Sequence, residues 1–438
     1  MKGVTALDDD MARAAETIGP VELLVGIPSY RNAATIGHVA RTVREGLSRS
    51  FGGMRVAVVN SDGGSEDGTR DRVAEALDGT PRIVGRYVGL PGKGSAFRAI
   101  FELAGRLNAR ACAVVDSDLR SITPEWIQRL LAPIVEDRAD YVAPLYARHK
   151  HDGTITNTIA YPLTRALYGL RVRQPIGGEF GFSGALARDF LEGGAFVPQA
   201  RRPSEGEAEH LSAREESPRP SVQNEVWEGD VARFGIDIYM TTTALVRGAR
   251  VAQAFLGAKV HDPKDPGADL GPMFRQVVGT AFRLAAANRA KWAAVKGSRE
   301  APVLGDVHPV DPEEVRADAA LLVRRFGEGA TEHGATWDAS LSKETRAAVR
   351  RAMDEAIPHA LAGETWARVV YDMLAASARD PSRTAERVTA LVPLYFGRVA
   401  AFIDDARDMT TAGSERLVED QALAFEAAKA YLSAQLAA

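Results

Sequence analysis

The sequence has little of what several functional classes require. Only one of its 438 residues is a cysteine, Cys112, so it can form neither an internal disulfide nor a thiolate metal cluster. Cys112 lies in an apolar run, where we expect it to pack in the core. The formal charge of −4 gives no bulk attraction to nucleic acid or to an anionic membrane surface. We therefore expect no redox chemistry and no nucleic-acid partner.

Long hydrophobic runs are also missing. No uninterrupted apolar stretch reaches the roughly 18 residues that a membrane-spanning helix needs. The N-terminal segment, residues 1–20, carries acidic side chains where a secretory signal would be basic and then apolar. We therefore expect a cytoplasmic protein with no membrane span.

Two periodicities alternate over the first 150 residues. β-rich runs, four of them nearly continuous in apolar residues, predict strands at 21–30, 55–62, 82–88, 111–118 and 141–148. Patterns between them predict helices at 34–47, 68–77, 95–107 and 123–134. This alternation predicts an α/β domain with a mostly parallel sheet covered by helices on both faces. Ligands bind such sheets beyond the carboxyl ends of the strands.

Two carboxylates, Asp116 and Asp118, end the predicted strand 111–118. We expect both to project into the ligand crevice at this end of the sheet. Residues two apart on a regular strand share a face at a spacing of about 6.6 Å, which is awkward for both to bind one small ion. We therefore expect only one of them to hold a metal. The alternative is that Asp118 or Ser121 only turns the chain.

Three further segments carry groups suited to a phosphorylated ligand. The loop at 59–69 combines Asp62 with glycines and suits a base or a ribose. The turn at 88–97 places Lys93 and free backbone donors before a helix, where they suit a phosphate. His261 precedes another helix and is either a structural histidine or a metal ligand.

Seven motifs follow one another between about residues 20 and 285: PSYRNAATI, NSDGGSEDGT, PGKG, DSD, QPIGGEFGFS, FGIDIYMTT and KVHDPKDP. This order resembles the retaining glycosyltransferases with the glycosyltransferase A fold that make glucosyl-3-phosphoglycerate, mannosyl-3-phosphoglycerate and mannosylglycerate. The resemblance implies transfer of glucose or mannose from a nucleotide sugar, with UDP-glucose and GDP-mannose as the leading donors. It also implies a small hydroxycarboxylate acceptor, such as D-glycerate or 3-phosphoglycerate, and retention at the anomeric carbon.

The resemblance also implies roles for individual residues. Asp118 and His261 become ligands of Mg²⁺ or Mn²⁺, and the imidazole favours Mn²⁺. Such a cation stabilises the charge that develops on the leaving diphosphate. The implied nucleotide-sugar-binding residues are Pro28, Ser29, Tyr30, Asp62, Gly92, Lys93, Asp116, Ser117, Gly178 and Glu179. The implied catalytic residues are Lys93, Glu179 and Asp237.

The segment at 173–187 is the expected floor for the sugar. Gly177 and Gly178 allow a close approach, and Glu179 suits sugar hydroxyls, although a tight turn with a surface glutamate is the alternative. Asp237 heads a helical pattern and is expected across the site. A double displacement would need a carboxylate nucleophile. The relatives instead react on one face of the sugar, so neither acid is assigned that role.

The acceptor segment departs from the phosphoglycerate-using relatives, because 149–169 lacks their glycine-arginine-threonine loop. It resembles the mannosylglycerate synthase type. We therefore expect D-glycerate to be used at least as well as 3-phosphoglycerate. The candidate acceptor-binding residues are Arg148, Thr154, Thr156, Asn157 and Arg165.

The expected organisation is a catalytic domain at 21–290 and a helical C-terminal domain at 305–438. The polar insert at 198–225 is a candidate active-site lid. Asp311 as cap and Pro312 as first residue predict where the helical domain begins. Its apolar run, 391–403, is either core or a homodimer contact, and we favour core.

Three other functions remain as alternatives. A polysaccharide or lipid-linked acceptor is disfavoured because no membrane span or basic amphipathic helix is evident. A sugar-1-phosphate nucleotidyltransferase would show a glycine-rich loop after the first strand, where this chain reads PSYRNAATIG. A catalytically inactive nucleotide-sugar sensor is disfavoured because Lys93, Asp116, Asp118 and His261 are all present.

Overall fold

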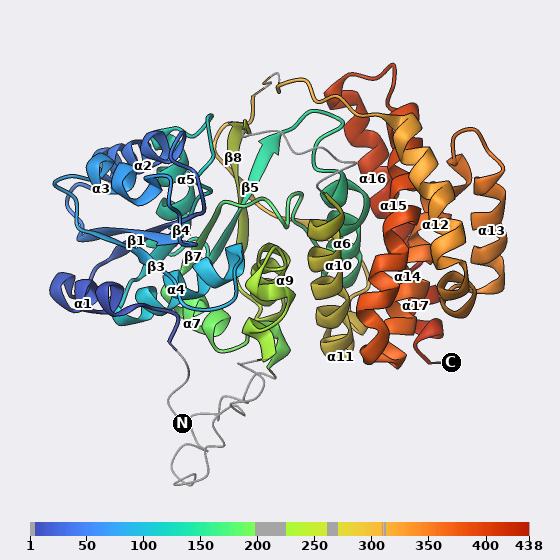
Figure 1. Ribbon diagram of the computed structural model, residues 1–438, viewed down its shortest axis with the longest axis horizontal. Coiled ribbons are helices and arrows are strands. Elements are labelled where there is room, and N and C mark those ends of the chain that lie inside the picture. Colours follow the sequence, from blue (N-terminus) through green and yellow to red (C-terminus); the bar gives the residue numbers. More distant parts are fainter. Residues whose placement is uncertain (1–4, 198–224, 261–269, 309, 311, 438) are drawn as a thin grey trace, which may run out of the picture.

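The computed structural model describes residues 5–197, 225–260, 270–308, 310 and 312–437 (Figure 1). An eight-stranded sheet, ordered β10-β8-β5-β7-β4-β1-β2-β3, forms its centre. These strands span Leu23–Ser29 (β1), Val56–Asp62 (β2), Arg82–Arg86 (β3), Ala111–Val114 (β4), Tyr141–Ala147 (β5), Phe180–Ser183 (β7), Val251–Ala258 (β8) and Val303–Leu304 (β10). A separate parallel pair joins β6 (Leu170–Arg171) to β9 (Arg299–Glu300).

The sheet is mostly parallel, as predicted. The exception is β7, which runs antiparallel to both of its neighbours, β4 and β5. All seven residues of β1 are buried because helices cover both faces of the sheet. The strand predicted at 111–118 ends at Val114, so Asp116 and Asp118 lie in the turn that follows it.

Two layers of helices cover the sheet (Figure 1). One layer contains α2 (Ile36–Phe51), α3 (Thr69–Ala76) and α5 (Pro124–Val135), and the other contains α1 (Asp9–Ile18), α4 (Lys93–Arg106), α7 (Gly184–Leu191) and α9 (Ile236–Val246). The second layer packs closely because β1 carries Gly26, where a Cβ atom would lie 2.6 Å from Ile100 of α4. Pro124 occupies the first position of α5, as predicted.

The remaining helices lie beyond one edge of the sheet. They are α6 (Tyr161–Tyr168), α10 (Leu270–Ala287), α11 (Arg289–Ala293), α12 (Ala319–Ser340), α13 (Lys343–Met353), α14 (Gly363–Arg379), α15 (Thr384–Asp405), α16 (Thr411–Ala427) and α17 (Lys429–Gln435). Their core contains the apolar run of α15, with Leu391 and Leu394 fully buried, so the predicted core role is confirmed.

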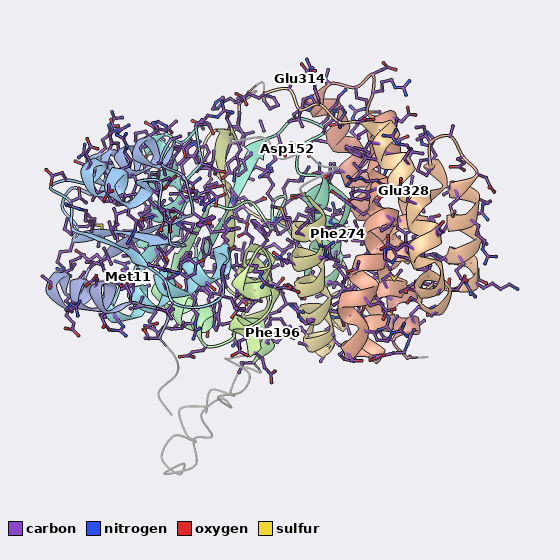
Figure 2. The ribbon with its side chains drawn as sticks, viewed as in Figure 1. Met11, Asp152, Phe196, Phe274, Glu314 and Glu328 are labelled. Carbon is purple, nitrogen blue, oxygen red and sulfur yellow. The ribbon has the colours of Figure 1, made fainter. Side chains whose placement is uncertain are left out.

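This helical core crosses the predicted boundary near residues 290–305. Leu163 of α6 and Phe274 of α10 pack in it together with Trp366 of α14. Phe274 lies at the junction of the two parts of the molecule (Figure 2), with its ring centroid 4.5 Å from that of Tyr395. Within this boundary region the chain also returns to the sheet as β10.

The predicted start of the helical region is wrong. Helix α12 begins at Ala319, and Asp318 caps it by accepting a hydrogen bond from the Leu321 amide at 2.9 Å. Asp311 lies outside the described residues, and residues 312–318 are not helical. This segment instead runs past the loop after β5, where the Val315 carbonyl is bonded to His151.

Among the described residues, no helix is long and apolar enough to span a membrane.

Candidate active site

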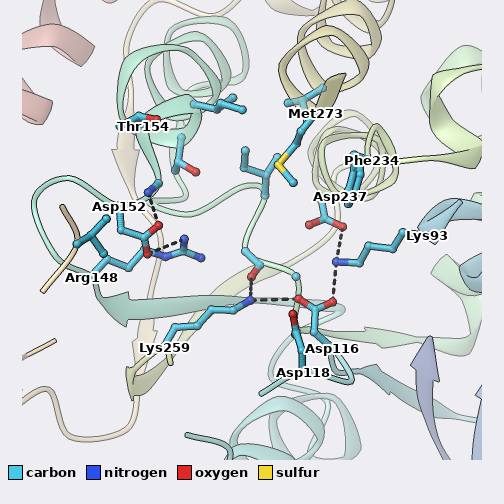
Figure 3. A pocket seen from close by; sticks show the side chains of 18 of the residues that line it. Lys93, Asp116, Asp118, Arg148, Asp152, Thr154, Phe234, Asp237, Lys259 and Met273 are labelled. Atoms are coloured by element: carbon cyan, nitrogen blue, oxygen red, sulfur yellow. Dashed lines mark hydrogen bonds and ion pairs between the residues drawn. The ribbon is translucent and has the colours of Figure 1, made fainter. Parts of the chain in front are cut away.

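A cavity of about 140 Å³ lies at the carboxyl ends of β4, β5 and β8 (Figure 3). Its charged lining includes Lys93, Asp116, Asp118, Arg148, Asp237 and Lys259. Apolar side chains from α10, such as Met273 and Val277, form part of its wall. The cavity therefore lies where the sequence predicted the ligand crevice, between the sheet and the helices beyond its edge.

Asp116 is held by two lysines. Its Oδ1 lies 2.8 Å from Lys93 Nζ, and its Oδ2 lies 3.2 Å from Lys259 Nζ (Figure 3). Burial alone would raise the pKa of Asp116, but the two ammonium groups outweigh it and lower that pKa well below the usual value. Asp116 is therefore ionised and already paired with cations of the protein.

Asp237 faces Asp116 across Lys93. It lies in the first turn of α9, and its Oδ1 is 3.4 Å from Lys93 Nζ. Burial raises the pKa of Asp237 above its usual value, and Lys93 only partly opposes this. The sequence expectation that Asp237 heads a helix at the site agrees with this position.

Glu179 is fully buried immediately before β7, so the alternative of a surface glutamate is wrong. Lys259 Nζ donates hydrogen bonds to its two carboxylate oxygens at 3.0 and 2.9 Å, and the Tyr146 hydroxyl donates another. Burial raises the pKa of Glu179 to about 7, although Lys259 opposes the shift. Glu179 is not part of the cavity lining described above; Lys259 is.

The glycines before Glu179 permit a close approach between groups of the protein. Gly178 has a φ of 98°, and a Cβ atom there would lie 2.4 Å from Asp116 Oδ2 and 2.9 Å from Lys259 Nζ. A Cβ atom at Gly177 would lie 2.1 Å from Pro144. Glycine is therefore needed here to bring Asp116 and Lys259 against the turn.

Asp118 differs from Asp116 in having no partner in the part of the chain that the structure describes. Its carboxylate lines the cavity, and no hydrogen bond or ion pair joins it to another described residue. His261, the second expected metal ligand, lies outside the described residues. Within the described part of the chain, no group of three or more histidine, cysteine, aspartate or glutamate residues is arranged to hold a metal ion.

The loop after β2 uses Asp62 differently from the expectation. Asp62 is fully buried, and it accepts hydrogen bonds from the Ser29 hydroxyl at 2.7 Å and from the Gly64 and Ser65 amides at 2.8 and 2.6 Å. Its carboxylate therefore fixes the loop instead of presenting itself to a base. Tyr30, beside this loop, is 55% exposed.

In the turn before α4, two of the expected backbone donors are already engaged. We expected free backbone donors there, but the Gly94 amide donates to the Arg233 carbonyl at 3.2 Å, and the Gly92 amide donates to the Tyr87 hydroxyl at 3.0 Å. A Cβ atom at Gly94 would lie 1.7 Å from the Val231 carbonyl oxygen. Close packing of this segment covers the start of α4, and Lys93 reaches the cavity through its side chain.

Ser117 lies in the turn between the two aspartates. Its hydroxyl donates to Asn32 Oδ1 at 2.8 Å, and its carbonyl accepts a hydrogen bond from the Thr35 hydroxyl at 2.9 Å. These bonds tie the turn to the chain that leaves β1 after Pro28 and Ser29. Ser117 therefore orients the aspartate turn.

The loop after β5 brings part of the expected acceptor set to the cavity. Arg148, Thr154 and Thr156 line it. Arg148 Nη1 lies 3.4 Å from Asp152 Oδ2, and its Nε is sheltered from water without a hydrogen-bond partner among the described residues. The Thr154 hydroxyl lies 2.6 Å from the Tyr395 hydroxyl of α15.

The assignment of Arg165 to the acceptor site does not agree with the structure. Its guanidinium is buried and lies 2.5 Å from Glu419 and 2.6 Å from Glu426, both on α16. Asn157 is also engaged, because its Oδ1 accepts a hydrogen bond from Arg173. The expected lid at 198–225 lies outside the described residues except for Glu225.

Residues 24–192 match the family model described as Glycosyl transferase family 2. This match indicates a glycosyltransferase, and the mostly parallel sheet with two helical layers is the glycosyltransferase A-type fold. No match was found among curated proteins.

The chain is also similar to solved structures of glucosyl-3-phosphoglycerate synthase from Mycobacterium tuberculosis. A complex with phosphoglyceric acid is 23% identical with a TM-score of 0.43, and a complex with Mn²⁺, UDP-glucose and phosphoglyceric acid is 22% identical with the same score. Each alignment covers 63% of this chain and 83% of the other. A mycobacterial protein is 21% identical with a TM-score of 0.40, covering 65% of this chain and 78% of that one.

Sequence reasoning missed two residues that organise the site, Lys259 and Tyr146. Lys259 directly follows β8, and its ammonium joins Asp116, Glu179 and the Gly177 carbonyl. Its place at a strand end, two residues before His261, was the available signal. Tyr146 lies near the end of β5, and nothing in its local sequence separates it from an ordinary core tyrosine.

Proposed function

We propose that the protein is a metal-dependent, retaining glycosyltransferase. It transfers glucose or mannose from a nucleotide sugar, UDP-glucose or GDP-mannose, to a small hydroxycarboxylate such as D-glycerate or 3-phosphoglycerate. The observation that carries the proposal is that one cavity is lined by a carboxylate, Asp118, and by a guanidinium nitrogen, Arg148 Nε, that both lack a partner among the described residues. The first suits a cation and the second suits a carboxylate.

The residues at the strand ends fit a divalent cation. Asp116 is neutralised by Lys93 and Lys259, whereas Asp118 has no partner among the described residues. Asp118 would therefore hold Mg²⁺ or Mn²⁺, and His261 is the proposed second ligand from the chain. When bound, such a cation stabilises the negative charge on a leaving diphosphate.

The charged side chains around the cavity have different roles in the proposed reaction. Lys93 and Lys259 place two ammonium groups beside Asp116, and Lys93 would face the phosphates of the donor. Asp237 lines the cavity and would accept hydrogen bonds from the sugar. The burial of Glu179 behind its bonds to Lys259 and Tyr146 disfavours it as a nucleophile and supports reaction on one face of the sugar.

The basic groups near the acceptor loop favour an unphosphorylated acid. Arg165 is bound to two glutamates, and Lys150 Nζ donates to three backbone carbonyls. Arg148 therefore remains to bind an acceptor carboxylate, whereas the phosphate of 3-phosphoglycerate would add about two further charges. We expect D-glycerate to be used at least as well as 3-phosphoglycerate.

The test combines purified protein and Mn²⁺ with each donor and each acceptor. Release of nucleoside diphosphate gives kcat/KM, and NMR of the product gives the anomeric configuration. Asp118→Asn should lower turnover about a hundredfold by removing a ligand of the cation, while Asp78→Asn, on an exposed side chain, should leave it unchanged.

Three results would contradict the proposal at different points. Asp118→Asn turnover within threefold of wild type removes the metal assignment. A tenfold preference for 3-phosphoglycerate overturns the acceptor expectation. No transfer from either donor to either acid overturns the function.

A further inference from the structure

Two side-chain nitrogens in the loop after β5 lack a hydrogen-bond partner among the described residues. Arg148 Nε is a donor, and His151 Nε2 belongs to a ring whose other nitrogen is engaged; both are sheltered from water and unpartnered among the described residues. Both residues line the cavity. Buried polar groups are nearly always paired, so two orphans in one cavity wall point to a ligand that completes them.

The bond to Val315 fixes the tautomer of His151. Its Nδ1 lies 3.1 Å from the Val315 carbonyl oxygen, which can only accept a hydrogen bond, so Nδ1 carries the proton. Burial lowers the pKa of His151, and the charge of the nearby Lys150 lowers it further. The hydrogen bond to Val315 and the charge of Glu314 raise the pKa but only partly offset this shift. The ring is therefore neutral near pH 7, and Nε2 presents a lone pair.

A lone pair at Nε2 selects the chemistry of its partner. A carboxylate or ionised phosphate oxygen has no proton to donate and would face the lone pair unfavourably. A hydroxyl can donate, and it would relieve the cost of the unpaired buried acceptor. The Arg148 guanidinium has the opposite requirement, because it can only donate.

We propose that His151 Nε2 accepts a hydrogen bond from the free hydroxyl of a hydroxycarboxylate acceptor whose carboxylate is bound by Arg148. This inference rests on the proposed function. It adds His151 as the residue that binds the acceptor hydroxyl to which no sugar is transferred. The loop thereby selects an acceptor with a terminal hydroxyl over one that carries a methyl or phosphoryl group there.

The test compares D-glycerate with D-lactate, in which hydrogen replaces the terminal hydroxyl. Wild type should prefer D-glycerate by about fivefold or more in kcat/KM, the effect of one well-formed hydrogen bond. His151→Phe should abolish this preference through a higher KM for D-glycerate. His151→Gln keeps a side-chain oxygen that can accept, so it should retain most of the preference.

D-lactate is the internal control for folding. Its kcat/KM should stay within threefold of wild type in both variants, since it lacks the hydroxyl that His151 would bind. An unchanged preference in His151→Phe, or no preference in wild type, overturns the inference while the proposed function stands. Failure of wild type to glycosylate either acid overturns both.

Discussion

At the scale of single residues, Gly178 is constrained both by its backbone conformation and by its neighbours. Its positive φ is one that L side chains rarely adopt, and two charged groups occupy the space of a Cβ atom. The turn before β7 and the Asp116–Lys259 contact therefore depend on the absence of a side chain at this position.

We expect Gly178→Ala to destabilise the protein and to lower its activity. Gly68 is a matched control, because its φ of 86° imposes similar backbone strain while nothing lies within 4 Å of a Cβ atom there. Gly68→Ala should cost about 1 kcal/mol from strain alone. Gly178→Ala should cost roughly 2 kcal/mol more, because Asp116 and Lys259 must shift. Urea denaturation measures both values, and equal losses would show that the contact is unimportant.

The residues of the site were predictable from the sequence where they follow a buried strand or begin a helix. Asp116, Asp118 and Asp237 reach the cavity because buried strands or a helix start place them there. Asp62 also ends a strand, but Ser29 of β1 and the amides of its own loop occupy its carboxylate with hydrogen bonds. Whether these hydrogen bonds form depends on how the loop folds back onto Asp62. The types and spacing of the residues do not predict this.

At the scale of elements, the loop after β5 is anchored to the helical region. Lys150 Nζ donates to the carbonyls of Ala406, Arg407 and Met409 at 2.8 to 2.9 Å, just beyond the end of α15. A cation is favoured at a helix C-terminus, where carbonyl groups lack partners. This contact holds the loop that carries Arg148 and His151.

Lys150→Met should loosen that loop. We expect a loss of about 1–2 kcal/mol in unfolding free energy from the charged hydrogen bonds. We also expect a higher KM for the acceptor with little change in KM for the nucleotide sugar, since Lys93 and the aspartates lie on other elements. Lys343→Met, at the exposed start of α13, is the control. Equal changes in both KM values would mean that Lys150 acts on the whole site.

Most elements were predictable because their local signals agree with their tertiary roles. The strands before residue 148 and the helices between them follow the two periodicities closely. Two elements did not follow local signals. The short β7 enters the sheet antiparallel, and Pro312 begins a stretch that crosses the β5 loop instead of a helix. In both cases contacts with distant chain decide the conformation.

At the scale of the whole molecule, the catalytic and helical regions share a core. Helix α6 packs against α16, helix α10 packs against α14 and α15, and Arg165 of α6 is paired with α16. The predicted boundary therefore does not mark two units that are separable by their packing.

A chain ending at residue 304 should not form a stable fold. It would keep Leu163 and Phe274 but lose Trp366 and Tyr395, leaving a large apolar surface exposed. We expect this fragment to aggregate or to lack a cooperative thermal transition by circular dichroism, whereas the full chain unfolds cooperatively. A soluble fragment with a sharp thermal transition would show instead that the catalytic region folds as an independent domain.

The central position of β7 also affects how the chain is made. β4 and β5 follow each other along the chain, yet β7 separates them in the sheet. While the ribosome is still synthesising residues before 180, both strands have an open edge that can pair with another chain. The period between the synthesis of β5 and of β7 is therefore when a nascent chain is most exposed to misassembly, and when a chaperone would protect it most.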